Sequence, residues 1–471
     1  MQSLTLVNVS QGFNTGIMPL GLASISAYLK QHGIADVRFL DSNCQDIYRD
    51  YVPTDCVGIS AVSQDAERAV KFARFVKSRG ETPVVLGGVH VSTYRQLPEP
   101  FDLGVIGEGE QTMLELMRLD GWADGRAREV PGVCWREGAE TRFAPPRALF
   151  EPLDQLPLPD RDLANLAHYL APQRIIPFHT GRSMTLLSSR GCPFRCVFCS
   201  TKVHWRKFRG FSAARVLAEM EVLIEKYGVE IIHLFDDLFI ADKRRFAAIH
   251  EGVLARGYHR RVKFMCLVRS DMLDDDTMRR LQEMNVVVTG IGMESGNDEV
   301  LAYLKQGTTT VEDNARAIEL SARYRIPTMG TFMVGNPHES EAQLLDTLRF
   351  IQGYRDNPYF APLSYIATTF PGTPFWDLAK ERGVPVEAFD RIAMDIPDSM
   401  EKLAAAPLLC EIPLDRFFPI LQAFQQETVI GTLKQQRFEA APPPPPRPAM
   451  RLGALPVRAG GRGLRVNRTV S

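Results

Sequence analysis

The first 120 residues alternate short apolar runs with stretches of helical periodicity. Strands are predicted at residues 4–9, 37–40, 57–60, 83–86 and 103–106. Between the first two, apolar side chains recur at Leu22, Ile25 and Leu29, the spacing of one helix face. Pro19 and Gly33 flank this helix at the positions that suit proline and glycine. Alternating strands and helices predict a parallel, doubly wound, Rossmann-like α/β sheet.

A second series of strands begins near residue 184. Strand-like runs are predicted at residues 184–188, 231–235, 262–267, 286–291, 328–334 and 364–368, with helical stretches between them. Six right-handed βα repeats are too few for a filled eight-stranded barrel, so we expect a partial (βα)6 barrel. In both kinds of sheet, ligands bind where the carboxyl ends of the strands meet.

The pattern divides the chain into five parts. They are an α/β domain at 1–145, a proline-dense connecting segment at 146–183, the barrel at 184–385, a helical C-terminal extension at 386–439 and a tail at 440–471. The tail holds prolines and arginines without acidic residues, which is typical of a disordered segment. It is either a plain solvated extension or a weak binding site for an anionic partner.

Composition adds limits on the partners. The chain has 471 residues, enough for two or three domains, and its 55 Lys and Arg residues nearly balance 56 Asp and Glu residues. No overall field therefore attracts nucleic acid or an anionic membrane. No apolar run reaches the roughly 18 residues of a membrane span, and the first residues lack the pattern of a secretory signal. We expect a soluble cytoplasmic protein with a small-molecule substrate.

Three of the eight cysteines lie close together, directly after the first barrel strand. Cys192, Cys196 and Cys199 have the spacing C-x3-C-x2-C, and thiolates suit zinc or an iron-sulfur cluster. A structural zinc site needs a fourth ligand, for which His204 is available. An iron-sulfur cluster with three protein ligands leaves one iron open to a small molecule. The position at the mouth of a barrel favours this open cluster.

This spacing, with Phe198 before the third cysteine, resembles the signature of the radical S-adenosylmethionine (SAM) superfamily. The likeness continues at the strand ends in residues 234–237, 267–271, 290–296 and 333–339. The resemblance implies a 4Fe-4S cluster on the three cysteines, with the amino and carboxylate groups of SAM on the open iron. Its electron would come from a donor such as flavodoxin or ferredoxin, and SAM cleavage would give a 5'-deoxyadenosyl radical.

The resemblance also implies SAM contacts. The Phe198 backbone would lie near the adenine, Asp236 near the amino group, and Arg269 and Glu294 near the ribose and carboxylate. The same side chains also suit structural roles, namely a helix N-cap for Asp236 and an ion pair between Glu294 and Arg269.

The remaining apolar and sulfur side chains are expected to fill space. Residues expected to line the barrel interior are Met265, Met293, Phe332 and Met333. Isolated cysteines expected to be small buried hydrophobes are Cys44, Cys56, Cys134 and Cys410. Cys266, in the third barrel strand, is either another of these or a residue that faces the barrel interior.

The N-terminal unit resembles the cobalamin-binding domain that precedes the radical SAM domain in one large subgroup. The segments that carry this likeness are residues 19–22, 87–90 and 107–110, and with the barrel it covers residues 1–385. The resemblance implies bound cobalamin near Gly87, Gly88, Gly107 and Glu108. Glycines suit such a site because a large ligand can then approach the backbone closely.

One feature departs from the cobalamin mutases. Their lower axial histidine comes from an Asp-x-His-x-x-Gly motif, which this sequence lacks. His90 follows Gly88 without that context, so we interpret it as a polar loop residue. Cobalamin would then bind with its lower face open, or the domain would be a vestigial scaffold.

The leading hypothesis is a cobalamin-dependent radical SAM methyltransferase that acts on an unactivated carbon of a lipid, a tetrapyrrole or a natural product. An oxidative cyclase of the anaerobic Mg-protoporphyrin monomethyl ester cyclase type has the same domain order, and residues 368–374 suit both. From another class, an iron-sulfur electron carrier or a SAM-binding sensor is the alternative. An exchangeable iron position argues against a carrier.

Overall fold

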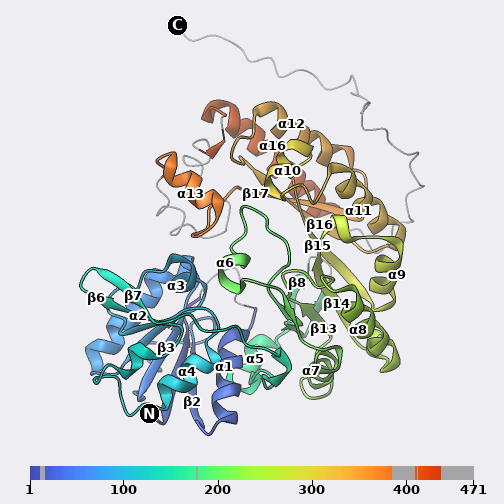
Figure 1. Ribbon diagram of the computed structural model, residues 1–471. Coiled ribbons are helices and arrows are strands. Elements are labelled where there is room, and N and C mark those ends of the chain that lie inside the picture. The colour runs from blue at the N-terminus through green and yellow to red at the C-terminus, as the bar shows by residue number, and fades with distance from the viewer. Residues whose placement is uncertain (11–15, 177–178, 385–408, 411, 436–471) are drawn as a thin grey trace.

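The computed structural model describes residues 1–10, 16–176, 179–384, 409–410 and 412–435. Two α/β bodies lie side by side, with the short helix α6 (Thr201–Trp205) between them (Figure 1). The tail at 440–471 and most of the predicted C-terminal extension before residue 409 lie outside the described residues. In the part of the chain that is described, no helix is long and apolar enough to cross a membrane.

The N-terminal body is a seven-stranded sheet in the order β2-β1-β3-β4-β5-β6-β7. Its first five strands are parallel and match the prediction: β1 (Ser3–Asn8), β2 (Asp36–Asp41), β3 (Cys56–Ser60), β4 (Val84–Gly87) and β5 (Leu103–Val105). The helices are α1 (Leu20–Gln31), α2 (Ala66–Arg79), α3 (Val89–Tyr94) and α4 (Glu110–Met117). The doubly wound sheet is therefore confirmed.

Two features of this sheet were not predicted. Strands β6 (Val133–Glu137) and β7 (Glu140–Phe143) add an antiparallel hairpin at the edge, and residues 89–94 form α3 instead of a loop. The hairpin strands are mostly polar and half-exposed, so they lack the apolar runs of the central strands.

Short elements connect the two bodies. They are α5 (Leu166–Tyr169), the hairpin of β8 (Gln173–Ile176) and β9 (His179–Gly181), and 3-10 turns at Leu153–Gln155 and Arg161–Leu163. The limits of the five predicted parts of the chain stay predictions.

The second body is a six-stranded parallel sheet in sequential order. Its strands are β10 (Ser183–Leu186), β13 (Ile231–Leu234), β14 (Lys263–Val268), β15 (Val286–Glu294), β16 (Thr328–Val334) and β17 (Phe360–Ile366). Since β10 and β17 do not pair with each other, the barrel is partial, as predicted. The last strand begins four residues before the predicted one, and its Pro362 suits an edge strand.

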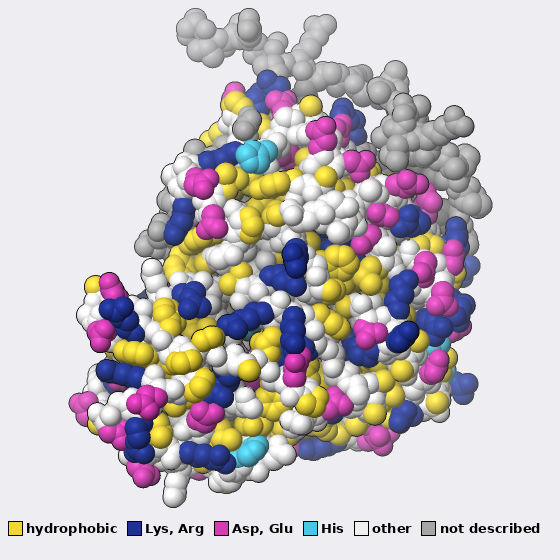
Figure 2. Space-filling model, viewed as in Figure 1, with side chains coloured by type: hydrophobic (Ala, Val, Ile, Leu, Met, Phe, Trp, Pro, Cys, Tyr) yellow, Lys and Arg dark blue, Asp and Glu magenta, His cyan; other side chains and the backbone are white. Residues whose placement is uncertain are grey.

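Helices cover the outer face of this sheet. They are α7 (Ala213–Glu225), α8 (Lys243–Ala255), α9 (Asp275–Glu283), α10 (Asp298–Leu304), α11 (Val311–Tyr324) and α12 (Glu341–Gly353). Beyond the sheet lie α13 (Pro374–Glu381) and α16 (Leu414–Gln435), and α16 packs against β17 and α12. Acidic and basic side chains are interspersed over the face in Figure 2, in keeping with the formal net charge of −1.

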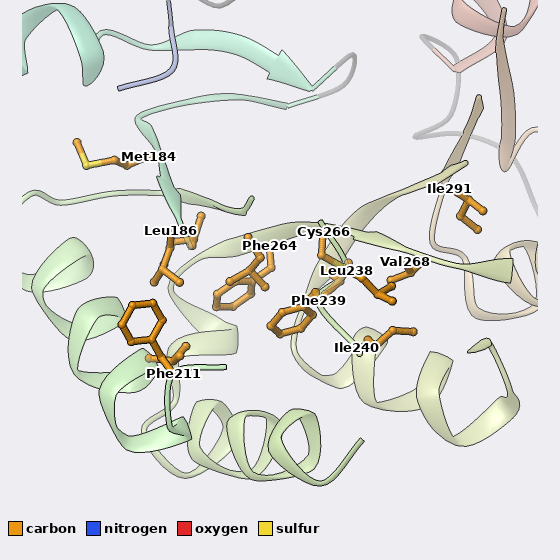
Figure 3. Close-up of a cluster of buried hydrophobic side chains, with 14 of the residues drawn as sticks. Met184, Leu186, Phe211, Leu238, Phe239, Ile240, Phe264, Cys266, Val268 and Ile291 are labelled. Atoms are coloured by element: carbon orange, nitrogen blue, oxygen red, sulfur yellow. The ribbon is translucent and has the colours of Figure 1, made fainter. Parts of the chain in front are cut away.

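The largest core lies between the barrel strands and these helices. Figure 3 shows part of it, with Leu186, Phe264, Cys266 and Val268 together with Phe211. Cys266 therefore faces the outer core, and the alternative prediction that it faces the barrel interior is wrong. Strand alternation explains this, because Cys266 and the inward Met265 are neighbours.

Two predicted lining residues are also corrected. Met293 and Phe332 are fully buried in the outer core, whereas Met265 and Met333 belong to other clusters, on the inner side. Neighbouring residues Phe332 and Met333 cannot both face inward on a strand. Met293 faces the same core as Ile291, two residues before it, as the alternation of a strand requires.

Candidate functional site

The three clustered cysteines lie on a loop closed by a two-stranded ribbon. Strand β11 (Ser189–Arg190) pairs with β12 (Arg209–Gly210), and residues 191–208 between them form what we call the cysteine loop. Gly191 begins this loop with φ +83°, and a Cβ there would lie 2.5 Å from the Lys207 carbonyl oxygen. Only glycine therefore permits this closure.

The donor set fits an iron-sulfur cluster. Cys192, Cys196 and Cys199 are free and partly exposed, and the Cys199 N–H donates to the Cys196 carbonyl at 3.2 Å. Burial raises the pKa of Cys192 to about 11, and neighbouring thiols and Asp237 add to the effect. Among the described residues, no three Cys, His, Asp or Glu side chains form a preassembled metal site. Three thiols on one loop nevertheless supply the ligands that a cluster with an open iron requires.

His204 does not complete this set. Burial lowers its pKa to about 4, and the charges that act on it belong to Glu108, Arg190, Arg209 and Glu110. Its ring lines the cavity between the two bodies, and its buried Nδ1 has no partner in the part of the chain that the structure describes. The structure thus gives no support to a zinc site closed by His204.

Arg269, at the end of β14, contacts the cysteine loop. Its Nη1 lies 3.5 Å from the Cys196 Sγ, and its guanidinium carbon lies 3.6 Å from the centre of the Phe194 ring. Its Nη2 donates to the hydroxyl groups of Thr308 and Thr309, at 2.9 and 2.7 Å. Arg269 therefore holds the loop against the barrel mouth.

Glu294 ends β15 in the left-handed region, with φ +64°, beside the β-bulge. It is buried, and its ion pair is with Lys305, at 3.5 Å, instead of the predicted pair with Arg269. Burial raises the pKa of Glu294, and Lys305 opposes that rise. Sequence reasoning missed Lys305, since nothing in its local context marks it as a partner.

The two aspartates after β13 have different surroundings. Asp236 is fully buried, and its Oδ1 accepts hydrogen bonds from the hydroxyl groups of Ser188 and Ser189. The predicted alternative, an N-cap, is wrong, because Asp242 caps α8. Asp237 is exposed and accepts from the Thr201 hydroxyl at 3.2 Å, on the cysteine loop. The contact of Asp236 with SAM stays a prediction, and Asp237 is a second acidic group beside the thiols.

Phe198 anchors the far side of the cysteine loop. Its half-buried ring packs in a cluster with Val197 and Phe375, and the Val197 N–H donates to the Leu304 carbonyl at 3.0 Å. The loop is thereby joined to α10 and α13 of the barrel. The predicted closeness of the Phe198 backbone to an adenine stays a prediction.

A cavity of about 280 Å³ lies between the N-terminal body and the cysteine loop. Gly87, Gly88 and Gly107 line it from the carboxyl ends of the strands, and His204 and Trp205 line it from the cysteine loop. The predicted glycine loops therefore meet at one cavity, whose walls are mostly apolar.

Gly88 and Gly107 have different structural roles in the cavity wall. A Cβ on Gly88, which has φ +95°, would lie 2.6 Å from the Ala61 carbonyl oxygen, so Gly88 lets two loops pack together. Gly107 has φ +78° with open space beside it, which leaves its backbone accessible. An accessible backbone in an apolar cavity fits part of a large ligand such as cobalamin.

Two polar residues of this region have partners within the chain. Glu108 is buried in ion pairs with Arg190 and Arg209 instead of pointing into the cavity alone. The His90 Nδ1 lies 3.1 Å from the Ser63 Oγ, and His90 lines a separate groove. His90 lies on α3, so the interpretation of it as a loop residue is wrong, while the expectation that it is not a cobalt ligand stays a prediction.

Comparisons with known proteins agree with both halves of the chain. Residues 186–351 match the radical SAM superfamily, and residues 13–117 match the B12 binding domain. An uncharacterized methyltransferase of Pyrococcus horikoshii is 29% identical over 378 residues, covering 77% of this chain and 78% of that protein. The anaerobic magnesium-protoporphyrin IX monomethyl ester cyclase of Rubrivivax gelatinosus is 28% identical, covering 79% and 67%.

Solved structures share the fold. The radical SAM methyltransferase TsrM from Kitasatospora setae is 20% identical, with a TM-score of 0.66 over 82% of this chain and 77% of that one. The cobalamin-dependent SAM radical enzyme OxsB is 18% identical, with a TM-score of 0.63 over 90% and 56%. Residues 186–351 therefore form a radical SAM domain and residues 13–117 a B12 binding domain before it, and the cofactors that go with these two domains are a 4Fe-4S cluster, SAM and cobalamin.

Proposed function

We propose that this protein is a methyltransferase that methylates an unactivated carbon of a small molecule. The observation that carries the proposal is that one loop serves both cofactor sites. The cysteines lie on the same loop as His204 and Trp205, which line the cavity of the B12 binding domain. When bound, the cluster and SAM supply a radical that removes a hydrogen atom from carbon, and cobalamin supplies the methyl group.

The chain's own residues hold and orient these groups. Cys192, Cys196 and Cys199 would bind the cluster, and Arg269 holds their loop through Cys196. Asp237 and Glu294 would meet the polar groups of SAM, because both acids lie at the carboxyl ends of barrel strands. An electron donor of the flavodoxin or ferredoxin type and a cytoplasmic location are part of the proposal.

The inner wall of the barrel suggests the kind of substrate. Phe235 directly follows β13, Leu267 lies on β14 and Tyr365 lies on β17, and these side chains are 40%, 36% and 37% exposed. Exposed apolar side chains on a concave wall favour a ligand with an apolar body. A tetrapyrrole, a lipid or an apolar natural product fits this wall.

His233 contributes a polar side chain to the inner wall of the barrel. It pairs in register with Thr185 and Met265, and both ring nitrogens are buried without a partner among the described residues. Burial lowers the pKa of His233 to about 4, so the neutral ring offers one donor and one acceptor. We infer that a neutral polar group of the substrate meets His233.

An oxidative cyclase is the second candidate. The likeness to the Rubrivivax gelatinosus cyclase over 79% of this chain favours it, because that protein shares most of the same two-domain span. Both reactions begin with removal of a hydrogen atom from the substrate, so the two candidates differ in the later step.

Nucleoside products distinguish these candidates. The protein is reconstituted without oxygen with iron, sulfide and cobalamin, reduced, and incubated with SAM in cell extract. Accumulation of both 5'-deoxyadenosine and S-adenosylhomocysteine supports the methyltransferase. 5'-Deoxyadenosine alone favours the cyclase, and neither product from protein with an assembled cluster contradicts both.

A further inference from the structure

The turn at Gly107–Glu110 reaches from the B12 binding domain to the ribbon under the cysteine loop. Glu108 accepts hydrogen bonds from Arg190 and from the Arg209 Nη1, the latter at 2.9 Å. Glu110 accepts from the Arg190 Nη2 at 2.6 Å and from the Ser24 Oγ at 2.7 Å. Two carboxylates and two guanidinium groups thus form a neutral cluster, which we call the clamp.

The clamp is shielded from water. All four of its side chains, Glu108, Glu110, Arg190 and Arg209, are less than one tenth exposed. Burial alone would raise the pKa of Glu110, but the charge of Arg190 and the hydrogen bonds from Arg190 and Ser24 together outweigh burial and hold that pKa below its usual value. Removing one partner would leave a buried charge without compensation, which is far more costly than loss of a surface pair.

The two arginines control the base of the cysteine loop. Arg190 and Arg209 are paired directly across the ribbon, so they flank the loop on its two sides. Cys192 follows Arg190 by two residues. Trp205 lies beside both guanidinium groups, with the centre of its ring 5.4 Å from Arg190 and 6.0 Å from Arg209. Any shift of the clamp would therefore move both ends of the loop and the wall of the cavity.

Glu108 has little capacity left for a ligand. Its Oε2 also accepts from the Phe150 N–H at 2.8 Å, and the Phe150 carbonyl accepts from Arg209 at 3.0 Å. Both oxygens are occupied by partners from the chain. Glu108 also lines the cavity, and its predicted contact with cobalamin stays a prediction.

We propose that the clamp is a positioning device, which fixes the cysteine loop against the B12 binding domain and so sets the separation of the two cofactor sites. Glu108, Glu110, Arg190 and Arg209 act through the loop and not on the substrate. The proposal rests on the two cofactor sites and holds for either candidate reaction.

The test compares Glu108→Gln with Glu427→Gln in the full chain. Glu427 is a matched control, because it is buried and paired with Arg355, at the junction of α16 with the barrel. Both changes remove one charge and keep the shape. We expect a fall in the midpoint of thermal unfolding in both variants, and the larger fall in Glu108→Gln, because the Arg209 side chain is 3% exposed whereas the Arg355 side chain is 44% exposed.

The first specific measurement is tryptic cleavage of the protein without cofactors. The cysteine loop carries Arg195, Lys202, Arg206 and Lys207. We expect cleavage in this loop to be at least fivefold faster in Glu108→Gln than in Glu427→Gln and the original chain. Equal rates in all three proteins would overturn the proposal.

The second measurement is pulsed electron paramagnetic resonance on the reconstituted protein, between Co(II) of cobalamin and the reduced cluster. We expect one narrow distance in the original chain and in Glu427→Gln, and a distribution at least twice as wide in Glu108→Gln. An unchanged width contradicts the clamp. Cobalamin affinity and iron content should stay within about twofold. A loss of cobalamin affinity with an unchanged distance would make Glu108 a cofactor contact instead.

A second variant covers the case in which Glu108→Gln does not fold. Glu110→Gln keeps the pair of Glu108 with Arg209, so a smaller effect in the same two measurements is expected. Both measurements are independent of methyl transfer. If the original chain makes no S-adenosylhomocysteine, the proposed function fails while tryptic cleavage and the cofactor distance still decide on the clamp.

Discussion

The two parallel sheets end in different kinds of residue. The strands of the N-terminal sheet run into glycines, such as Gly87, Gly88 and Gly107, around a mostly apolar cavity. The barrel strands run into charged side chains, such as Asp236, Arg269 and Glu294. Backbone and apolar walls suit a large ligand held by its shape, whereas charged side chains suit a small polar ligand. The same edge of a parallel sheet thus serves two kinds of recognition.

Removing one of the three clustered thiols should have the largest effect on activity. It should abolish the functions of the barrel and leave those of the N-terminal body unchanged. In Cys192→Ala, Cys196→Ala or Cys199→Ala, we expect loss of the iron-sulfur absorption and of 5'-deoxyadenosine formation, while cobalamin binding stays. Cys44→Ala is the control, because Cys44 lies in the N-terminal body, far along the chain from the loop. Retained SAM cleavage in any of the three variants would contradict the cluster assignment.

The buried Glu339 tests how much free energy of unfolding is lost when a carboxylate is charged at the carboxyl end of a barrel strand. It accepts from the Gly335 and Asn336 N–H groups, yet burial raises its pKa to about 7. Because the folded pKa lies above the unfolded one, the protonated form contributes stability that is full below about pH 4.5 and is lost as pH rises through 7.

The expected size of this loss is about 3 kcal/mol in the free energy of unfolding. Denaturant unfolding between pH 5 and pH 8 measures it. Glu339→Gln should remove this part of the pH dependence. An equal dependence in the variant would show that other groups cause it.

Gly88→Ala tests the glycine side of the comparison. The new Cβ would meet the Ala61 carbonyl oxygen at 2.6 Å, at a φ of +95°. We expect a loss of about 1–3 kcal/mol in stability and a tenfold weaker cobalamin affinity, with unchanged iron content. Gly353→Ala is the control, because a Cβ there meets nothing within 4 Å. If cobalamin affinity is equal in both variants, the loop at Gly88 does not shape the cavity.

His233→Phe should have the smallest effect on stability. It should change only the interaction of the protein with its substrate. The change removes two unpartnered ring nitrogens, so stability should be kept or rise slightly. We expect unchanged formation of 5'-deoxyadenosine and about a tenfold fall in methylated product. An unchanged yield of product would mean that buried water, and not the substrate, meets His233.

The sequence predicted the order of the strands and the cysteine loop, because periodicity and spacing are local signals. All six barrel strands and the first five strands of the N-terminal sheet were found in this way. The spacing of Cys192, Cys196 and Cys199 identified the superfamily for the same reason.

Contacts between distant residues could not be predicted in this way. Glu108 and Arg209 are 101 residues apart, so no local pattern reveals their ion pair. The pair of Glu294 with Lys305 depends on backbone geometry around a β-bulge, which the sequence does not mark. Gly107 lines the cavity and its closeness to cobalamin stays a prediction, whereas the ion pairs of Glu108 with Arg190 and Arg209 were not foreseen.

The fate of the SAM methyl group tests the central claim most directly. The reconstituted, reduced protein is incubated in cell extract with SAM that carries a deuterated methyl group, and products are analysed by mass spectrometry. The account predicts a small molecule that gains the labelled methyl group on carbon, together with S-adenosylhomocysteine and 5'-deoxyadenosine. If all of the label remains in methionine while 5'-deoxyadenosine forms, the protein is not a methyltransferase.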